Sequence, residues 1–103
     1  MVQTLQPSNE KIKQYLENLP DWQIIVINEV EQLQRQYSFK NFVEAMAFAN
    51  KVGELAEEHN HHPAILIEWG KCQVNWWTHT LNGLADNDFI LAAQSDALFT
   101  TAN

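Results

Sequence analysis

The stretch that decides the fold is residues 57–79, which read EEHNHHPAILIEWGKCQVNWWTH. Pro63 must end the helix-like segment before it, because proline lacks an amide hydrogen and its ring clashes with the preceding helical turn. Residues 64–69 are apolar apart from Glu68 and predict a strand. Gly70 and Lys71 predict a two-residue turn, and residues 72–79 predict a second strand. This stretch therefore predicts a helix end that leads directly into a β-hairpin.

Residues 72–79 alternate between the two faces of the predicted strand, as the period of two requires. One face carries Cys72, Val74, Trp76 and Thr78, and the opposite face carries Gln73, Asn75, Trp77 and His79. The first set predicts the buried face, and the second predicts a face that is open to solvent or to another subunit.

Upstream of this hairpin, residues 41–58 have the strongest helical pattern in the chain. Asn41 is a candidate N-cap, with Glu44 three residues later in a variant of the capping box. The predicted apolar stripe consists of Phe42, Met46, Ala49, Val52 and Ala56, broadened by Phe48 and Leu55.

An earlier hairpin precedes that helix. Residues 22–27 are rich in β-branched side chains and predict a strand, and Asn28 and Glu29 predict a polar turn. Residues 33–39 then alternate between apolar and polar positions, which is typical of an antiparallel strand. Arg35 falls on the apolar face, either as a snorkelling side chain or as an ion-pair partner, and we expect its role to be structural.

Two further helices are predicted towards the ends of the chain. Ser8 is a candidate N-cap for the first helix, and Pro20 ends it. The last helix begins near Asp86 and Asp88, whose charges suit the positive end of a helix dipole. Its predicted apolar positions are Phe89, Ala92, Ala93 and Ala97.

The order of elements predicts an α+β fold of the form α-β-β-α-β-β-α. Two hairpins joined by a long amphipathic helix suggest one four-stranded antiparallel sheet with three helices on one face. At 103 residues, the chain is expected to form a single domain, residues 1–103.

Composition narrows the classes of function. Apolar residues make up 46% and charged residues 18%, which indicates a globular protein. The net charge of −7 disfavours direct binding to nucleic acid or anionic lipid, so a small, neutral or weakly cationic ligand fits better. A single cysteine, no basic-then-apolar leader and no apolar run of about 20 residues predict a cytoplasmic protein without a membrane span.

All four histidines lie within the opening stretch, and three interpretations are open. His59, His61 and His62 could bind a metal together with Glu57 or Glu58, but in an extended loop His61 and His62 point to opposite sides. The histidines could instead only cap the helix, which explains His59 best. The third interpretation is acid–base catalysis, because imidazole exchanges protons near neutral pH.

At these positions the sequence resembles the pterin-4a-carbinolamine dehydratase family. The motif consists of a glutamate, three variable residues and His-His-Pro, then Thr-His at a strand end, Gly-Leu and an aspartate-bearing helix. These elements are Glu57, His61-His62-Pro63, Thr78-His79, Gly83-Leu84 and Asp88. Trp22 and the segment Phe39-Lys40-Asn41-Phe42 extend the resemblance over nearly the whole chain.

The resemblance implies loss of water from a 4a-hydroxytetrahydropterin to give quinonoid dihydropterin, in the recycling of tetrahydropterin. It implies that His61 and His79 form an acid–base pair and that His62 helps to hold the pterin. We further expect Glu57, Trp77 and Asp88 to contribute to substrate binding. No metal or other cofactor is implied. The expected partners are the pterin and further copies of the chain, in a homodimer or homotetramer.

Three positions depart from the family pattern. Ile65 stands where an aromatic residue is usual, Trp77 replaces a smaller polar residue, and Ala85 occupies a position where Ser or Thr commonly caps the last helix. The alternative function is therefore a non-catalytic binding or assembly protein on the same fold. The intact His61, His62 and His79 favour the enzyme.

Overall fold

The computed structural model describes residues 6–102, with side chains for residues 6–100, and over that range it contains three helices and four strands. In chain order these are α1 (Asn9–Glu17), β1 (Gln23–Ile27), β2 (Val30–Ser38), α2 (Phe42–His59), β3 (Ala64–Glu68), β4 (Lys71–Trp76) and α3 (Asp86–Ala102). None of the helices within this range is long and apolar enough to cross a membrane.

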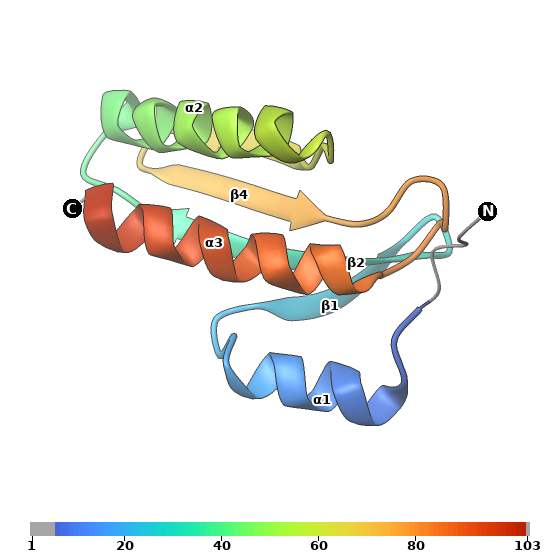
Figure 1. Ribbon diagram of the computed structural model, residues 1–103. Coiled ribbons are helices and arrows are strands. Elements are labelled where there is room, and N and C mark those ends of the chain that lie inside the picture. Colours follow the sequence, from blue (N-terminus) through green and yellow to red (C-terminus); the bar gives the residue numbers. More distant parts are fainter. Residues whose placement is uncertain (1–5, 103) are drawn as a thin grey trace.

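The strands form one antiparallel sheet in the order β1-β2-β4-β3, so each hairpin supplies one central strand and one edge strand. α2 packs over β3 and β4, while α3 lies beside α2 and packs over β4 and β2 (Figure 1). α1 lies next to α3, where the ring of Tyr15 stacks on Phe89 at a centroid distance of 4.7 Å. The predicted α+β fold and element order are confirmed.

The caps of the first two helices are also confirmed. The Ser8 side chain accepts a hydrogen bond from the Lys11 backbone N–H, and the Asn41 side chain accepts one from Glu44. These bonds satisfy backbone donors that have no partner inside the helix, and they fix where α1 and α2 begin.

The second hairpin differs from its prediction at both ends. Its turn is formed by Trp69 and Gly70, one residue earlier than expected. Gly70 suits this position because it takes a positive φ of 72° and because a Cβ atom there would lie 3.1 Å from the Phe39 carbonyl oxygen. β4 ends at Trp76 and does not reach His79. The chain turns away at that point, since Thr78 bridges to Gly83 and not to a neighbouring strand.

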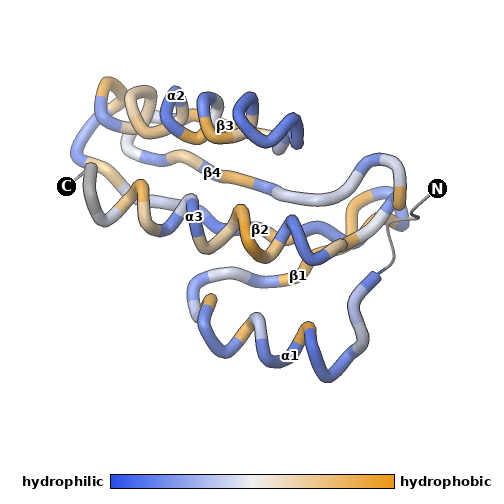
Figure 2. Tube along the Cα trace, viewed as in Figure 1, coloured by the Kyte–Doolittle hydropathy of each residue, from blue (hydrophilic) through white to orange (hydrophobic). Residues whose placement is uncertain are grey.

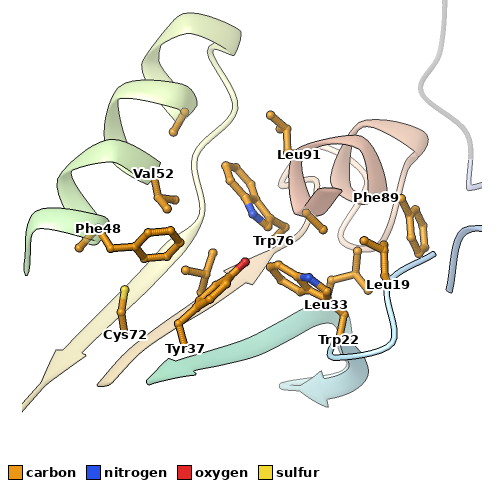
Figure 3. Packing of buried hydrophobic residues seen from close by; sticks show 14 of the residues in the cluster. Leu19, Trp22, Leu33, Tyr37, Phe48, Val52, Cys72, Trp76, Phe89 and Leu91 are labelled. Atoms are coloured by element: carbon orange, nitrogen blue, oxygen red, sulfur yellow. The ribbon is translucent and has the colours of Figure 1, made fainter. Parts of the chain in front are cut away.

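The core lies between the sheet and the helices (Figure 3). Leu33 and Tyr37 of β2 and Val74 and Trp76 of β4 are buried, which confirms the inward faces predicted from alternation. Figure 2 shows hydrophobic segments along the sheet and hydrophilic residues at the C-terminal end of α2.

The buried faces of two helices were predicted only in part. In α2 the positions Phe48, Ala49, Val52 and Ala56 are buried as predicted, but Phe42 and Met46 are each 42% exposed. Ala45, which was not predicted, is buried. Phe42 and Met46 lie four residues apart and therefore share one side of the helix, which reaches solvent.

In α3, Phe89 and Ala92 are buried as predicted. Ala93 and Ala97 are exposed, and Leu91 and Ser95 are buried in their place. Ser95 faces the core because its hydroxyl accepts a hydrogen bond from the indole of Trp76 at 3.1 Å. The run of small alanines gave little information about which side of α3 is buried.

Arg35 forms an ion pair, as one of the two alternatives predicted. Its guanidinium lies 2.7 Å from Asp96 of α3, whose carboxylate also accepts hydrogen bonds from the Trp22 indole and the Tyr37 hydroxyl. Burial and the bond to Asp96 raise the pKa of Tyr37, so its hydroxyl remains a neutral donor. This cluster joins α3 to β2 and to the segment before β1.

The β1–β2 turn gives the first testable prediction. Asn28 and Glu29 have φ values of 50° and 67°, and a two-residue turn with both central residues left-handed is a type I′ turn that favours glycine at its second position. Glu29→Gly should therefore stabilise the protein by about 0.5–1 kcal/mol, measured by urea unfolding. Gly70→Ala is the matched control and should destabilise it. An unchanged or lowered unfolding midpoint for Glu29→Gly would contradict this assignment.

Candidate active site

The end of α2 directs the His-His-Pro segment towards α3. Asn60 follows the last helical residue in a left-handed conformation, with φ 48° and ψ 45°, which asparagine tolerates better than most residues. The next backbone N–H, from His61, donates to the Ala56 carbonyl at 3.1 Å. This turn closes the helix and places His61 against the N-terminus of α3.

His61 bonds to a buried carboxylate. Its Nε2 lies 2.7 Å from Asp88 Oδ1, and Asp88 is fully buried. The other oxygen of Asp88 accepts hydrogen bonds from the Thr78 hydroxyl at 2.7 Å and from the Ala85 backbone N–H at 2.8 Å. Asp88 thereby supplies one half of a capping box for α3, which offsets part of the cap expected to be missing at Ala85.

His62 and His79 lie on the exposed side of the same site. His62 Nε2 lies 2.5 Å from Glu57 Oε2, and both side chains are more than half exposed. His79 Nε2 lies 3.2 Å from the backbone carbonyl oxygen of His62. The ring of His79 also stacks on Trp77, with 4.5 Å between centroids and 11° between planes.

These partners assign the proton positions on the three rings. The Nε2 atoms of His61, His62 and His79 face Asp88, Glu57 and a carbonyl oxygen, respectively, and carboxylates and carbonyls only accept hydrogen bonds. Each Nε2 therefore carries a hydrogen. In a neutral ring this leaves the lone pair on Nδ1, so Nδ1 is the nitrogen that can accept a proton.

The three histidines line one cavity of about 340 Å³. Its lining residues are Asn60, His61, His62, Thr78, His79 and Thr80. Asn60 and Thr80 were not singled out from the sequence. The position of Asn60 after a helix is a recognisable signal for a left-handed cap, whereas nothing in the sequence marks Thr80.

The three residues expected to bind substrate lie around this cavity and do not line it. Asp88 lies beneath it, bonded to His61, and Glu57 lies beside His62. Trp77 lies against His79 and lines a separate groove on the open sheet face, together with Gln32 and Asn75. Ile65 packs against the core.

The metal interpretation finds no support in the geometry. Over the part of the chain that the structure describes, no group of three or more His, Cys, Asp or Glu side chains is arranged to hold a metal ion.

Comparison with known sequences gives a consistent result. The model of a family described as pterin 4 alpha carbinolamine dehydratase matches residues 6–98. A Marinobacter nauticus protein, provisionally named a pterin-4-alpha-carbinolamine dehydratase, is 61% identical over 84 residues, covering 82% of this chain and 76% of that protein. A Syntrophotalea carbinolica protein with the same provisional name is 52% identical over 89 residues, covering 86% and 80%.

Two solved structures share the fold. One is a transcriptional coactivator/pterin dehydratase from Brucella melitensis, with a TM-score of 0.80 and 26% identity, covering 91% of this chain and 98% of that chain. The other is a pterin dehydratase-like protein described as a RuBisCO assembly factor in the alpha-carboxysome. It has a TM-score of 0.63 and 23% identity and covers 76% and 88%. At that identity, the second likeness concerns the fold alone.

Asp88 gives the second prediction. Asparagine has nearly the same shape but is uncharged and has only one acceptor oxygen. Asp88→Asn should therefore weaken or break bonds that a carboxylate makes to His61, Thr78 and Ala85. Because bonds to a buried charge are strong, we expect a loss of about 1.5–3 kcal/mol in the free energy of unfolding, measured with urea.

Asp86→Asn is the matched control. It removes the same charge from the same helical turn, where the carboxylate is partly exposed and contacts Lys11 and Tyr15. Its loss in the free energy of unfolding should be clearly smaller than that of Asp88→Asn. Equal losses in the two variants would show that the buried network around Asp88 contributes no more than a surface carboxylate.

Proposed function

The chain belongs to the pterin-4a-carbinolamine dehydratase family, and we propose that it removes water from 4a-hydroxytetrahydropterins by histidine acid–base catalysis. The observation that carries this proposal is the meeting of His61, His62 and His79 around one cavity. A proton-transfer site needs titrating groups that converge on one bound molecule, and imidazole serves this purpose near neutral pH.

The reaction requires one proton to be supplied and one to be removed. The bond between C4a and its hydroxyl oxygen breaks, and an acid gives that oxygen a proton so that it leaves as water. A base takes the proton from N5, and the electron pair left behind forms the N5–C4a double bond. The product is quinonoid dihydropterin, and the protein ends with the same number of protons as at the start.

His61 and His79 are the proposed acid–base pair. In a neutral ring Nδ1 accepts the N5 proton, and in a charged ring the Nδ1–H group donates to the leaving hydroxyl. Their anchored Nε2 atoms support these roles, because a bond at one nitrogen restricts the motion of the ring and leaves Nδ1 unoccupied. Asp88 acts through His61, since it is fully buried.

His62 and Glu57 are proposed to hold the pterin. His62 lines the cavity and forms an exposed pair with Glu57 beside it. A pterin ring carries several N–H groups from which a carboxylate can accept hydrogen bonds. Physiologically, the proposed role is the recycling of tetrahydropterin after hydroxylation reactions. The first substrate to test is therefore a freshly formed 4a-hydroxytetrahydropterin.

We also propose that the protein is a homodimer or homotetramer. β3 is an edge strand whose outer edge pairs with no other strand among residues 6–102, and it contains neither lysine nor proline. Nearby α2 exposes the large apolar side chains Phe42, Val43 and Met46. An exposed apolar surface beside a free strand edge supports association with a second copy.

The catalytic proposal predicts the effects of histidine variants. His61→Ala and His79→Ala should each lower the dehydration rate by about 100-fold or more, because general acid–base catalysis contributes that much. The rate is followed by ultraviolet absorbance after rapid formation of the substrate. His59→Ala is the control, since His59 is exposed on the last turn of α2 and lies outside the cavity.

The result that would refute the catalytic proposal is a folded wild-type protein that does not accelerate dehydration above the rate in buffer. Full activity in both His61→Ala and His79→Ala would leave the dehydratase assignment intact but refute the acid–base pair.

The oligomer proposal predicts a change in molar mass for an α2 variant. Wild type should elute with the mass of two or four chains in size-exclusion chromatography with light scattering. Met46→Glu should shift it towards the monomer, because burying a charge at an interface is unfavourable. Val26→Glu is the control, as Val26 is an exposed apolar residue on the opposite edge strand. A monomeric wild type would contradict the proposal.

A further inference from the structure

Trp77 lies flat against the His79 imidazole, with 4.5 Å between ring centroids and 11° between ring planes. It does not line the cavity that the three histidines share. We propose that Trp77 is a positioning residue that holds the His79 ring in the orientation needed for proton transfer. This inference rests on the proposed function and assigns Trp77 a role different from the substrate contact expected from the sequence.

His79 needs such support because it lies outside the regular structure. β4 has ended at Trp76, and His79 is an exposed residue in the turn that follows. Its Nε2 reaches the His62 carbonyl oxygen at 3.2 Å, which fixes one point on the edge of the ring. One bond at an exposed position leaves the ring free to tilt, whereas a stacked indole restricts that motion from the face.

The backbone around Thr78 brings the two rings together. The Thr78 backbone N–H donates to the Gly83 carbonyl at 2.8 Å, and its side chain donates to buried Asp88 at 2.7 Å. Residues on either side of an extended position point to the same face. Thr78 is thus fixed from two directions, and Trp77 and His79 share a face because of it.

Trp77 is itself held in place. Its side chain is partly buried and packs against the core, and it lines the groove on the open sheet face beside Gln32 and Asn75. These two amides are almost fully buried and bond to each other at 2.9 Å. The indole therefore links a rigid part of the sheet to an exposed catalytic ring.

Stacking on a face suits a residue that exchanges protons. Both nitrogens of an imidazole lie in the ring plane, so a ring that is covered on one face still presents Nε2 and Nδ1 at its edge. Trp77 restricts the tilt of His79 without occupying either nitrogen. Without the stacking contact, His79 should still be able to exchange protons, but its ring should adopt the required orientation less often.

Nuclear magnetic resonance of the ligand-free protein tests the contact itself. The ring protons of His79 lie over the indole, so its ring current should shift their signals upfield in wild type. Trp77→Leu should move them towards ordinary histidine positions, and Trp77→Phe should keep part of the shift. Signals assigned with His79→Gln and unchanged in Trp77→Leu would overturn the inference. This comparison does not depend on catalytic activity.

Steady-state dehydration kinetics test the positioning role. Trp77→Leu should lower kcat by about two- to tenfold, the range expected for one aromatic pair, with KM changed less than twofold. Trp77→Phe should restore most of kcat because it can still stack. Trp69→Leu is the matched control, since Trp69 is exposed at the opposite end of the hairpin. Circular dichroism checks that each variant is folded.

The outcomes separate the competing explanations. A rise in KM with kcat unchanged would overturn positioning and indicate that Trp77 contacts the pterin directly. An equal loss of kcat in Trp77→Phe and Trp77→Leu would also overturn it, because stacking would then not be the cause. Wild-type protein without any dehydratase activity would refute the proposed function, while the resonance comparison would still decide whether Trp77 holds His79.

Discussion

The buried carboxylate of Asp88 is the interaction on which the rest of the structure depends. Its two oxygens accept from His61, from the Thr78 side chain and from the backbone of Ala85. These donors come from the segment after α2, the segment after β4 and the start of α3. A buried charge is stable only when it is well supplied with hydrogen bonds, so the three segments must meet at this point. The same meeting encloses the histidine cavity.

α3 makes further hydrogen bonds that fix its position on the sheet. Further along the helix, Ser95 accepts from the Trp76 indole, and Asp96 accepts from Trp22, Arg35 and Tyr37. Polar groups at several positions along one helix therefore bond to the strands beneath it and to the segment before β1. Apolar packing alone would tolerate a small rotation or slide of α3, but directed hydrogen bonds to buried partners do not. These hydrogen bonds therefore also fix the position of Asp88 beneath the cavity.

Much of the fold could be predicted from local patterns. The period-two alternation of β2 and β4 identified the buried faces, and Ser8 and Asn41 marked helix starts because their caps are local interactions. The faces of α2 and α3 were predicted only in part. Which side of a helix is buried depends on where it crosses the sheet, and small alanines such as Ala93 fit either environment.

The sequence identified the residues of the site better than it identified their arrangement in space. Sequence motifs identified the three histidines, but motifs do not show that Asp88 lies beneath His61, because that contact joins residues 27 positions apart. The early end of β4 was also missed. Its cause is the bridge between Thr78 and Gly83, a contact formed only after the chain has turned.

The two proposed proton-transfer residues are held by different physical means. His61 is largely buried and bonded to Asp88, so its orientation is coupled to the stability of the whole fold. His79 is exposed and is held by a carbonyl oxygen and a stacked ring, which contribute little to global stability. A substitution near His79 should therefore alter the proposed proton transfer while the protein stays folded, whereas one near His61 should disturb both the proposed proton transfer and the fold. Substitutions that alter the site while preserving the fold are therefore easiest on the side of His79 and Trp77.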